Sequence, residues 1–377
     1  MAGIYIHIPF CKQACHYCDF HFSTNQSYKS EMISGLCREI DLQRDYLSGE
    51  PIETIYFGGG TPSVLSNLEL AQILEKISKT FPIVHSPEIT LEANPDDLSK
   101  QTLENFKSLG INRLSIGIQS FQDEFLKFMN RAHNKEQSFK AVANAQEVGF
   151  DNISVDLIYG IPHPNHEPFL NDLNQLIDLQ TSHISAYCLT IEPKTAFGKW
   201  VHQGKMQNPD ENFAAEQFEI LMSTFEKAGI EQYEISNFAR NQQYSKHNTN
   251  YWKGVKYLGI GPGAHSYNGK ARQYNIANNA IYLRELGKNN LSYEIENLTD
   301  TNIFNEYILT SIRTIWGLSI NTLKKINLEY YKEIETEMAI LIESEHLILK
   351  NDRISLSRQG KFLADEITAK LLVVENL

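Results

Sequence analysis

The sequence lacks any apolar run close to the about 18 residues that a membrane-spanning helix needs. Its amino terminus has no basic stretch ahead of an apolar core, so we expect no export signal. Positive charge is also scarce: 34 Lys and Arg residues face 46 Asp and Glu residues, and the formal net charge is −12. Because nucleic-acid affinity depends largely on cationic contacts to phosphates, we expect no nucleic-acid partner. Peripheral contact with a membrane stays compatible with this composition.

Cysteine is equally sparse, with five residues in a chain of 377. An odd number of cysteines without an export signal argues against a disulfide framework and predicts a reducing, cytoplasmic location. Cys37 and Cys188 lie among apolar neighbours, where packing is the expected role. The other three, Cys11, Cys15 and Cys18, fall within eight residues in the stretch CKQACHYCDF. That concentration indicates a site.

The first half of the chain alternates β-rich runs with stretches of helical periodicity, which is typical of parallel strands buried on both faces. The expected strands cover residues 3–10, 52–60, 88–95, 113–121, 152–160 and 183–193. Polar or glycine-rich residues follow every one of them. Barrel enzymes build sites from many strand ends, whereas an open doubly wound sheet uses one switch point. We therefore predict an α/β fold with a partial or complete (β/α) barrel, and an open doubly wound sheet as the alternative.

The pattern divides the chain into three parts. Residues 1–200 form the predicted barrel, and the less regular residues 201–290 form an extension of it. Residues 291–377 are mostly helical, with a hairpin expected to turn at Asn351 and Asp352. Helices followed by a hairpin and a further helix predict a winged-helix-like C-terminal domain. Its mildly acidic charge favours a packing or partner-binding role over DNA binding.

The C-x3-C-x2-C spacing supplies three thiolates from one loop directly after the first strand. A four-iron cluster held this way keeps one iron without a protein ligand, and a small molecule with amino and carboxylate groups can bind there. A closed zinc site is an alternative, with His7, His16 or His21 as the fourth ligand. A thioredoxin-like pair would leave Cys11 unused.

Two motifs together resemble the radical S-adenosylmethionine (SAM) superfamily. They are YIHIPFCKQACHYCDF around the three cysteines and GGGTP at residues 58–62. The resemblance covers most of the chain and narrows to the group that contains oxygen-independent coproporphyrinogen III dehydrogenases and the related HemW-like heme chaperones. It implies a radical SAM barrel, with Cys11, Cys15 and Cys18 holding a [4Fe-4S] cluster.

The resemblance also implies a set of SAM-binding residues near the strand ends. Glycines would let the backbone approach SAM closely, and an arginine would bind its carboxylate through a charge-assisted contact. The set consists of Tyr5, Tyr17, Gly59, Gly60, Thr61, Glu92, Gln119, Arg131 and Asp156.

Within that group, the sequence departs from the dehydrogenases. They carry a further cysteine where this chain has Phe20, and an extension before the first strand, which here follows Met1 almost directly. The segment HNTNYW matches the HNxxYW motif of the heme chaperones. The resemblance therefore implies a heme site at His247, Tyr251 and Trp252, since imidazole can ligate heme iron and aromatic rings can line a porphyrin.

We accordingly predict a heme chaperone that binds a [4Fe-4S] cluster, SAM and heme, and that delivers heme to an acceptor protein of unknown identity. His265, in GIGPGAHSY, is a second candidate for the heme ligand. Cleavage of SAM and a purely structural role for SAM both stay open. The alternatives are a coproporphyrinogen III dehydrogenase and a zinc-stabilised interaction protein.

Overall fold

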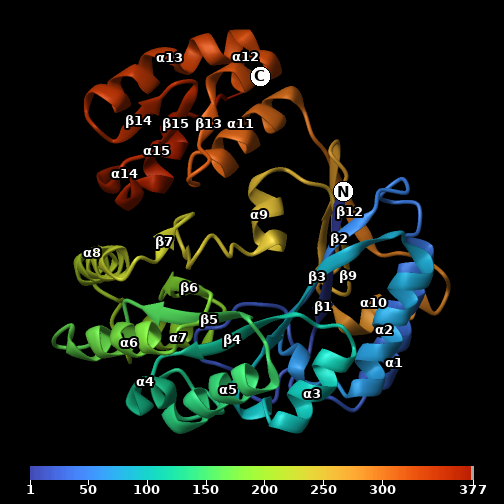
Figure 1. Ribbon diagram of the computed structural model, residues 1–377. Coiled ribbons are helices and arrows are strands. Elements are labelled where there is room, and N and C mark those ends of the chain that lie inside the picture. Colours follow the sequence, from blue (N-terminus) through green and yellow to red (C-terminus); the bar gives the residue numbers. More distant parts are fainter. Residues whose placement is uncertain (375–377) are drawn as a thin grey trace.

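The computed structural model describes residues 1–374 and contains two units with separate hydrophobic cores (Figure 1). The larger is an α/β unit built on one long, curved sheet. The smaller is mostly helical, begins at Asp300, and stands over the side of the sheet opposite the helices of the first half.

The first six strands run parallel and neighbour one another in chain order. They are β1 (Ala2–Ile8), β2 (Ile52–Gly59), β3 (Ile83–Ala93), β4 (Arg113–Gln119), β5 (Asn152–Tyr159) and β6 (His183–Cys188). A doubly wound sheet would reverse its strand order near the middle, and this order does not. The sheet keeps two free edges, so the barrel is partial. The predicted α/β barrel is confirmed in its partial form.

Helices connect these strands and cover the outer face of the sheet, where Figure 1 shows them as one layer. They are α1 (Lys29–Leu42), α2 (Asn67–Thr80), α3 (Lys100–Ser108), α4 (Asp123–Phe128), α5 (Lys135–Val148) and α6 (Glu167–Asp178), with short 3₁₀ turns η1 (Pro62–Val64) and η2 (Pro95–Asp97). Helix α5 shows how local sequence sets the boundaries. It begins at a capping box of Asn134 and Gln137 and ends at Gly149, whose φ of 88° suits a residue without a side chain.

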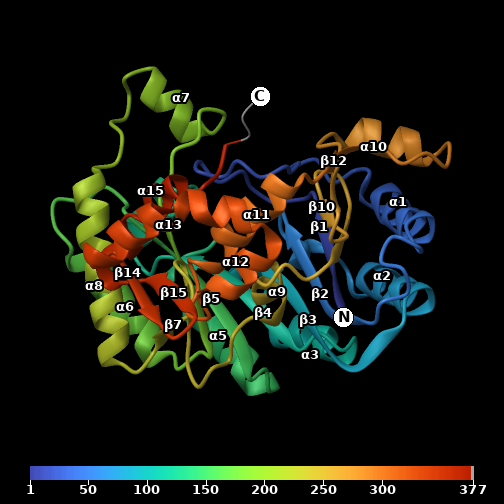
Figure 2. The same cartoon turned by 90° about the horizontal axis from the view of Figure 1, so that it is seen from above.

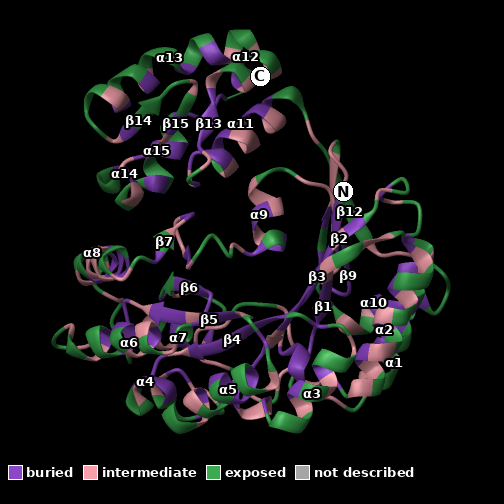
Figure 3. Ribbon diagram, in the orientation of Figure 1, coloured by how far each residue is buried: buried purple, intermediate pink, exposed green. Residues whose placement is uncertain are grey.

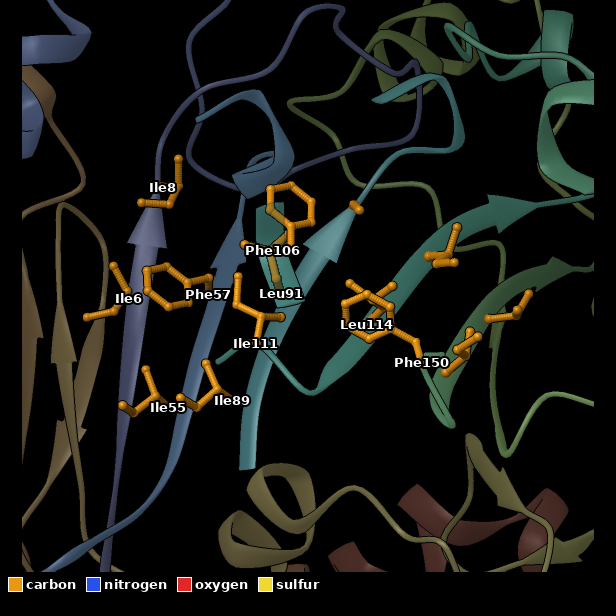
Figure 4. Close-up of a cluster of buried hydrophobic side chains, with 14 of the residues drawn as sticks. Ile6, Ile8, Ile55, Phe57, Ile89, Leu91, Phe106, Ile111, Leu114 and Phe150 are labelled. Carbon is orange, nitrogen blue, oxygen red and sulfur yellow. The ribbon is translucent and has the colours of Figure 1, made fainter. Parts of the chain in front are cut away.

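The main core lies between the sheet and this helical layer. Ile6 and Ile8 on β1, Phe57 on β2 and Leu91 on β3 point to the same side, and Phe106 of α3 packs among them (Figure 4). Full burial of such a side chain contributes about 1.5–3 kcal/mol. The alternation of these residues with polar ones follows from the two-residue period of a strand.

The opposite face of the strands is polar, although barrel interiors are usually filled with branched apolar residues. Ser115 donates to the Asp156 carboxylate at 3.2 Å, and Ser154 hydrogen-bonds to His183 at 2.7 Å. Arg113 is 1% exposed, and its Nε and Nη1 atoms have no partner within residues 1–374. Burying such groups costs free energy. The interior is therefore suited to binding polar groups rather than to packing alone.

Residues beyond β6 extend the same sheet at both edges. Beside β6 lie β8 (Asn237–Ala239) and β7 (Glu231–Gln232), and beside β1 lie β9 (Tyr257–Ile260), β10 (His265–Tyr267), β11 (Ala271–Asn275) and β12 (Tyr293–Asn297). The helices of this region are α7 (Ala196–His202), α8 (Glu211–Lys227), α9 (Lys246–Trp252) and α10 (Asn279–Leu286). The sheet thus continues a few residues past position 290, where the sequence pattern placed the last boundary.

The C-terminal unit has the element order of a winged helix. It contains α11 (Asp300–Ser311), β13 (Leu318–Ser319), α12 (Ile320–Ile326), α13 (Leu328–Glu343), β14 (Leu347–Lys350), β15 (Arg353–Leu356), α14 (Arg358–Phe362) and α15 (Ala364–Lys370). The predicted hairpin turns at Asn351, whose φ is 58°, and Asp352. Viewed from above, this unit covers the middle of the sheet (Figure 2), and both units contain buried residues (Figure 3). Within residues 1–374, every helix is too short or too polar to cross a membrane.

We expect Phe57→Ala to lower the free energy of unfolding of the apo protein by about 3–5 kcal/mol, because Phe57 is fully buried between β2 and the helical layer. Leu68→Ala, on the exposed face of α2, is the matched control and should change it by less than about 0.5 kcal/mol. Urea unfolding followed by circular dichroism measures both. Equal effects would contradict the assigned core.

Candidate functional site

The loop that carries the three thiols follows β1 directly and is held by hydrogen bonds at several points. The Cys11 amide donates to the Ser23 carbonyl at 3.1 Å, which closes the loop on itself. The His16 ring bonds to the Phe128 carbonyl at 2.8 Å and so ties the loop to the segment after β4. His7, a second of the histidines considered for zinc, bonds to the His21 carbonyl at 2.8 Å. The rings of His16 and His7 therefore stabilise the position of the loop through hydrogen bonds.

The three thiols are partly buried, and two of them accept hydrogen bonds from side chains in the loops that follow β2 and α4. Thr61 donates to the Cys11 sulfur at 3.4 Å, and Arg131 donates to the Cys15 sulfur at 3.3 Å. Burial raises the pKa of Cys11 to about 11 and that of Cys18 to about 12. Because only thiolates ligate iron, loading the loop with metal releases protons. Three neighbouring sulfurs, two of which accept hydrogen bonds, fit the edge of an iron–sulfur cluster, whose potential such hydrogen bonds tune.

Arg131 connects the loop to the sheet. Its Nη1 also donates to the Tyr17 hydroxyl at 3.3 Å, and its Nη2 donates to Asn94 Oδ1 at 2.6 Å and to the Gly117 carbonyl at 2.7 Å. Its Nε is buried without a partner in residues 1–374, so a donor remains for a bound group. Asn94 was not among the predicted residues. The position of Asn94 two residues after Glu92, in LEANP, could have indicated that it belongs to the site.

The glycines of GGGTP are required by contact between two strand ends. A side chain at Gly60 would lie 2.6 Å from the Phe10 carbonyl, and one at Gly59 would lie 2.5 Å from the His7 ring. Gly59 also has a φ of 104°. This close approach lets the Thr61 amide donate to the Phe10 carbonyl at 2.7 Å. The backbone of these glycines therefore approaches β1 and the cysteine loop closely. The sequence had suggested a close approach of the same backbone to SAM.

Two acidic side chains lie on the polar face of the sheet, Glu92 on β3 and Asp156 on β5, with β4 between these strands. Glu92 accepts from the Tyr56 hydroxyl at 2.8 Å and from the Gly59 amide at 3.2 Å. Burial raises the pKa of Glu92 to about 7 and that of Asp156 to about 6, and the nearby Asp156 charge contributes to the rise for Glu92. A cationic ligand placed here would stabilise both in their ionised form.

Two further predicted residues complete this rim. Gln119 ends β4 with a φ of 70°, a left-handed conformation that costs a residue with a side chain free energy and is frequent at functional sites. Tyr5 on β1 hydrogen-bonds to His7 at 3.3 Å and stacks on Tyr56 with ring centroids 6.1 Å apart. Hydrogen bonds thus connect several of the predicted residues. Cys11 is bonded to Thr61, and Glu92 is bonded to Gly59. Arg131 is bonded to both Cys15 and Tyr17.

A cavity of about 1430 Å³ opens beside this rim, between the cysteine loop, α9, the β9–β11 edge and the C-terminal unit. Aromatic side chains form much of its wall: Tyr5, Phe20, Tyr251, Trp252, Tyr257, Tyr267, Tyr307 and Trp316. Phe20 of the cysteine loop is 67% exposed and faces this space. The wall is formed by both units, so the cavity exists only in the complete fold.

The HNTNYW segment forms α9 and presents two of its three predicted residues to the cavity. Tyr251 and Trp252 line it. His247 is 2% exposed and lies behind Tyr251, with Nδ1 2.8 Å from the Thr54 hydroxyl and Nε2 2.9 Å from the Tyr251 hydroxyl. Burial lowers the pKa of His247 to about 3. Both ring nitrogens are therefore engaged, and the structure does not bring this imidazole to the cavity wall.

The two remaining cysteines differ from each other. Cys37 is buried in the core of α1, as expected. The expectation that Cys188 is packed was wrong: it is exposed at the end of β6, because that strand runs out to the open rim. Sequence reasoning also missed Arg113, although a charged residue at the head of the apolar run RLSIGI was a visible signal.

Comparison with known proteins agrees with this geometry. Residues 5–176 match the family model of the radical SAM superfamily. The chain is 35% identical to the heme chaperone HemW of Bacillus subtilis, over 99% of both sequences. The chain belongs to the HemW family. It is also 37% identical to the Escherichia coli heme chaperone HemW, over 70% of this chain and 69% of that protein.

A solved structure gives independent support for the fold. The radical SAM enzyme coproporphyrinogen III oxidase from Escherichia coli superimposes with a TM-score of 0.86, covering 99% of this chain and 90% of that one at 21% identity. Like other radical SAM proteins, this HemW-family chain uses a [4Fe-4S] cluster and SAM, and the three thiols, the unpartnered Nε of Arg131 and the buried carboxylates of Glu92 and Asp156 fit such groups.

Glu92 predicts a pH dependence of the apo protein's stability. With a raised pKa, the folded state holds a proton that the unfolded chain releases near its ordinary value of 4.5. The resulting stabilisation is complete below about pH 4.5 and is lost as the pH rises through about 7. Glu92→Gln should therefore reduce the loss of unfolding free energy between pH 5 and pH 8 by about 1–3 kcal/mol.

Anaerobic urea unfolding of the reduced apo protein at both pH values measures this difference. Glu333→Gln, on an exposed face of α13, is the control and should leave the pH profile as in the wild type. An unchanged profile in Glu92→Gln would show that Glu92 titrates normally in the folded protein.

Proposed function

We propose that this protein is a heme chaperone that carries heme and passes it to an acceptor protein. The observation that carries the proposal is the 35% identity, over 99% of both chains, to a protein named heme chaperone HemW. The similarity extends over the C-terminal unit and the HNTNYW segment as well as the barrel. A shared radical SAM barrel alone would support only the cofactors.

We propose that the three thiols of the loop hold the cluster and that the strand ends hold SAM. Cys11, Cys15 and Cys18 are the ligands, and Arg131 donates to the sulfur of one of them while keeping its Nε for SAM. Glu92 and Asp156 offer negative charge to the cationic cofactor. Tyr5, Tyr17, Gly59, Gly60, Thr61 and Gln119 complete the proposed SAM site.

Heme is the cargo, and the aromatic cavity is the proposed place for it. Its volume of about 1430 Å³ exceeds the roughly 300–1,000 Å³ of common small-molecule sites and leaves room for a large planar macrocycle. Tyr251 and Trp252 offer aromatic surface to a porphyrin. His247 supports this wall by holding the Tyr251 hydroxyl. Phe20 of the cysteine loop brings the cargo site next to the cluster site.

The acceptor is proposed to be a protein that receives heme from the open side of this cavity. We further propose a cytoplasmic location, which is supported by the cysteine content: all five residues are free thiols. A reducing compartment keeps thiols in that state.

The proposal predicts that anaerobically reconstituted protein binds stoichiometric heme together with iron and sulfide. Supplied with SAM, a reductant and coproporphyrinogen III, it should form no protoporphyrinogen. Metal analysis, visible absorbance and chromatography of the porphyrins measure these quantities. Product formation would favour the dehydrogenase, and a colourless protein containing zinc would favour the interaction protein.

Trp252→Ala should weaken heme binding by about two- to tenfold, since an aromatic contact contributes about 0.5–1.5 kcal/mol beyond area burial. The iron and sulfide content should not change, because Trp252 lies outside the cysteine loop. Tyr293→Ala, an exposed aromatic residue on β12 outside the cavity, is the matched control. Heme titration followed at the Soret band measures the affinity, and equal affinities in both variants would place heme elsewhere.

A further inference from the structure

Arg113 is a positive charge buried in the interior of the partial barrel. It opens β4, is 1% exposed, and its Nε and Nη1 atoms have no hydrogen-bond partner within residues 1–374. An arginine side chain stays charged under all conditions in which a protein is folded. A buried charge without a partner destabilises a fold, and apolar residues of similar volume often stabilise it instead. Packing alone therefore gives no reason for an arginine at this position.

The register of the sheet places Arg113 on the same face as the two buried carboxyl groups. Arg113 pairs with Thr90 of β3, and Ser115 pairs with Glu92 of the same strand. Side chains two residues apart on a strand point to the same face of the sheet, so Arg113, Ser115 and Glu92 face the barrel interior together. Ser115 also donates to Asp156 on β5 at 3.2 Å. Arg113 therefore lies on the strand between the two carboxyl groups, one side chain closer to the amino end.

The charge of Arg113 acts on both carboxyl groups. Burial raises the pKa of Glu92 to about 7 and the pKa of Asp156 to about 6, and the positive charge of Arg113 opposes the rise in each. Arg131 also acts on Asp156. Both terminal nitrogens of Arg131, however, donate to the cysteine loop or to the segments that follow β3 and β4. Arg113 has no such task.

Other titratable groups around the pair are uncharged near neutral pH in the empty protein, because they are buried as well. Burial raises the pKa of the hydroxyl and thiol groups and lowers the pKa of the imidazoles. These groups are the Tyr5, Tyr56, Tyr187 and Tyr251 hydroxyls, the Cys11 thiol, and the His183 and His247 rings.

Glu88 is a further buried carboxylate on β3, two residues before Thr90. It accepts from the backbone amides of Lys246 and His247 at 3.2 and 3.0 Å. Its contacts are thus with the first turn of α9, and the two nitrogens of Arg113 remain without a partner beside it.

We propose that Arg113 is a positioning residue of the proposed SAM site, whose unpaired charge keeps Glu92 and Asp156 as the carboxylates that attract the cationic cofactor near neutral pH. This inference rests on the SAM site proposed above and adds to it a residue that acts through its neighbours. SAM carries a sulfonium and an ammonium group, and carboxyl groups attract these charges only when they are ionised. The buried guanidinium lets two neighbouring carboxyl groups ionise before the cofactor arrives.

The test measures SAM affinity by calorimetric titration of anaerobically reconstituted protein between pH 5.5 and pH 8.5. In the wild type, affinity should fall at low pH as the carboxyl groups take up protons, with a midpoint that belongs to the pair. Arg113→Met should raise that midpoint by about one unit and weaken binding at pH 5.5 by about tenfold. At pH 8.5 its affinity should equal or exceed that of the wild type, because the arginine no longer repels the cofactor. Titration of SAM itself is common to all variants.

Three further variants control this result. Arg113→Lys keeps a positive charge and should stay close to the wild-type midpoint. Arg113→Met combined with Asp156→Asn should move the midpoint back down, because the Asp156 charge no longer acts on Glu92. Arg44→Met removes an exposed arginine beyond α1 and should leave the profile unchanged. If Arg113→Met does not fold, Arg113→Gln provides the same comparison with a neutral polar side chain.

The outcomes separate two failures. If the wild type binds no SAM, or if Glu92→Gln and Asp156→Asn bind it as tightly as the wild type, the proposed SAM site falls and this inference falls with it. If those variants weaken SAM binding while Arg113→Met keeps the wild-type profile, only the role of Arg113 is overturned. An equal loss of affinity at every pH in Arg113→Met would also overturn it, since the arginine would then support the shape of the site and not the charge of its carboxylates.

Discussion

The guanidinium of Arg131 is the contact on which the site depends. It reaches a cysteine sulfur and a tyrosine hydroxyl of the loop on one side, and Asn94 and the Gly117 carbonyl on the other. A flexible loop with three thiols has no defined geometry of its own, and a planar group with five donors can fix it against two strand ends at once. Strands β1 to β6 pair in the order in which they occur in the chain, so their carboxyl ends lie along one rim. Arg131 can therefore contact the cysteine loop and two strand ends at the same time.

The polar interior of the partial barrel lowers the stability of the protein when no ligand is bound. Arg113 is buried with two nitrogen atoms that lack a partner within residues 1–374, and burial raises the pKa of the Glu92 and Asp156 carboxyl groups. Such groups destabilise the empty protein and favour ligands that complete their pairing. The apolar layer on the other face of the strands compensates, since Ile6, Ile8, Phe57 and their neighbours are fully buried.

The extension of the sheet beyond β1 decides where a cargo can lie. Strand β9 pairs in parallel with β1, so the hairpin that follows it stands next to the cysteine loop, and the C-terminal unit covers the space from above (Figures 1 and 2). The cluster site and the aromatic cavity therefore share a wall, which includes Tyr5 and Phe20. A chain with this barrel but without that unit would have the rim and no enclosed cavity.

The sequence by itself determined the α/β alternation, the cysteine loop, the set of polar strand ends and the hairpin at Asn351, because each depends on residues close together in the chain. Only the tertiary structure decided which of these side chains are free. His247 bonds to Thr54, 193 residues away, and is turned from the cavity, while His265 faces it. Motif spacing cannot report such contacts, since the groups that a side chain bonds to in the folded protein can lie far away in the chain.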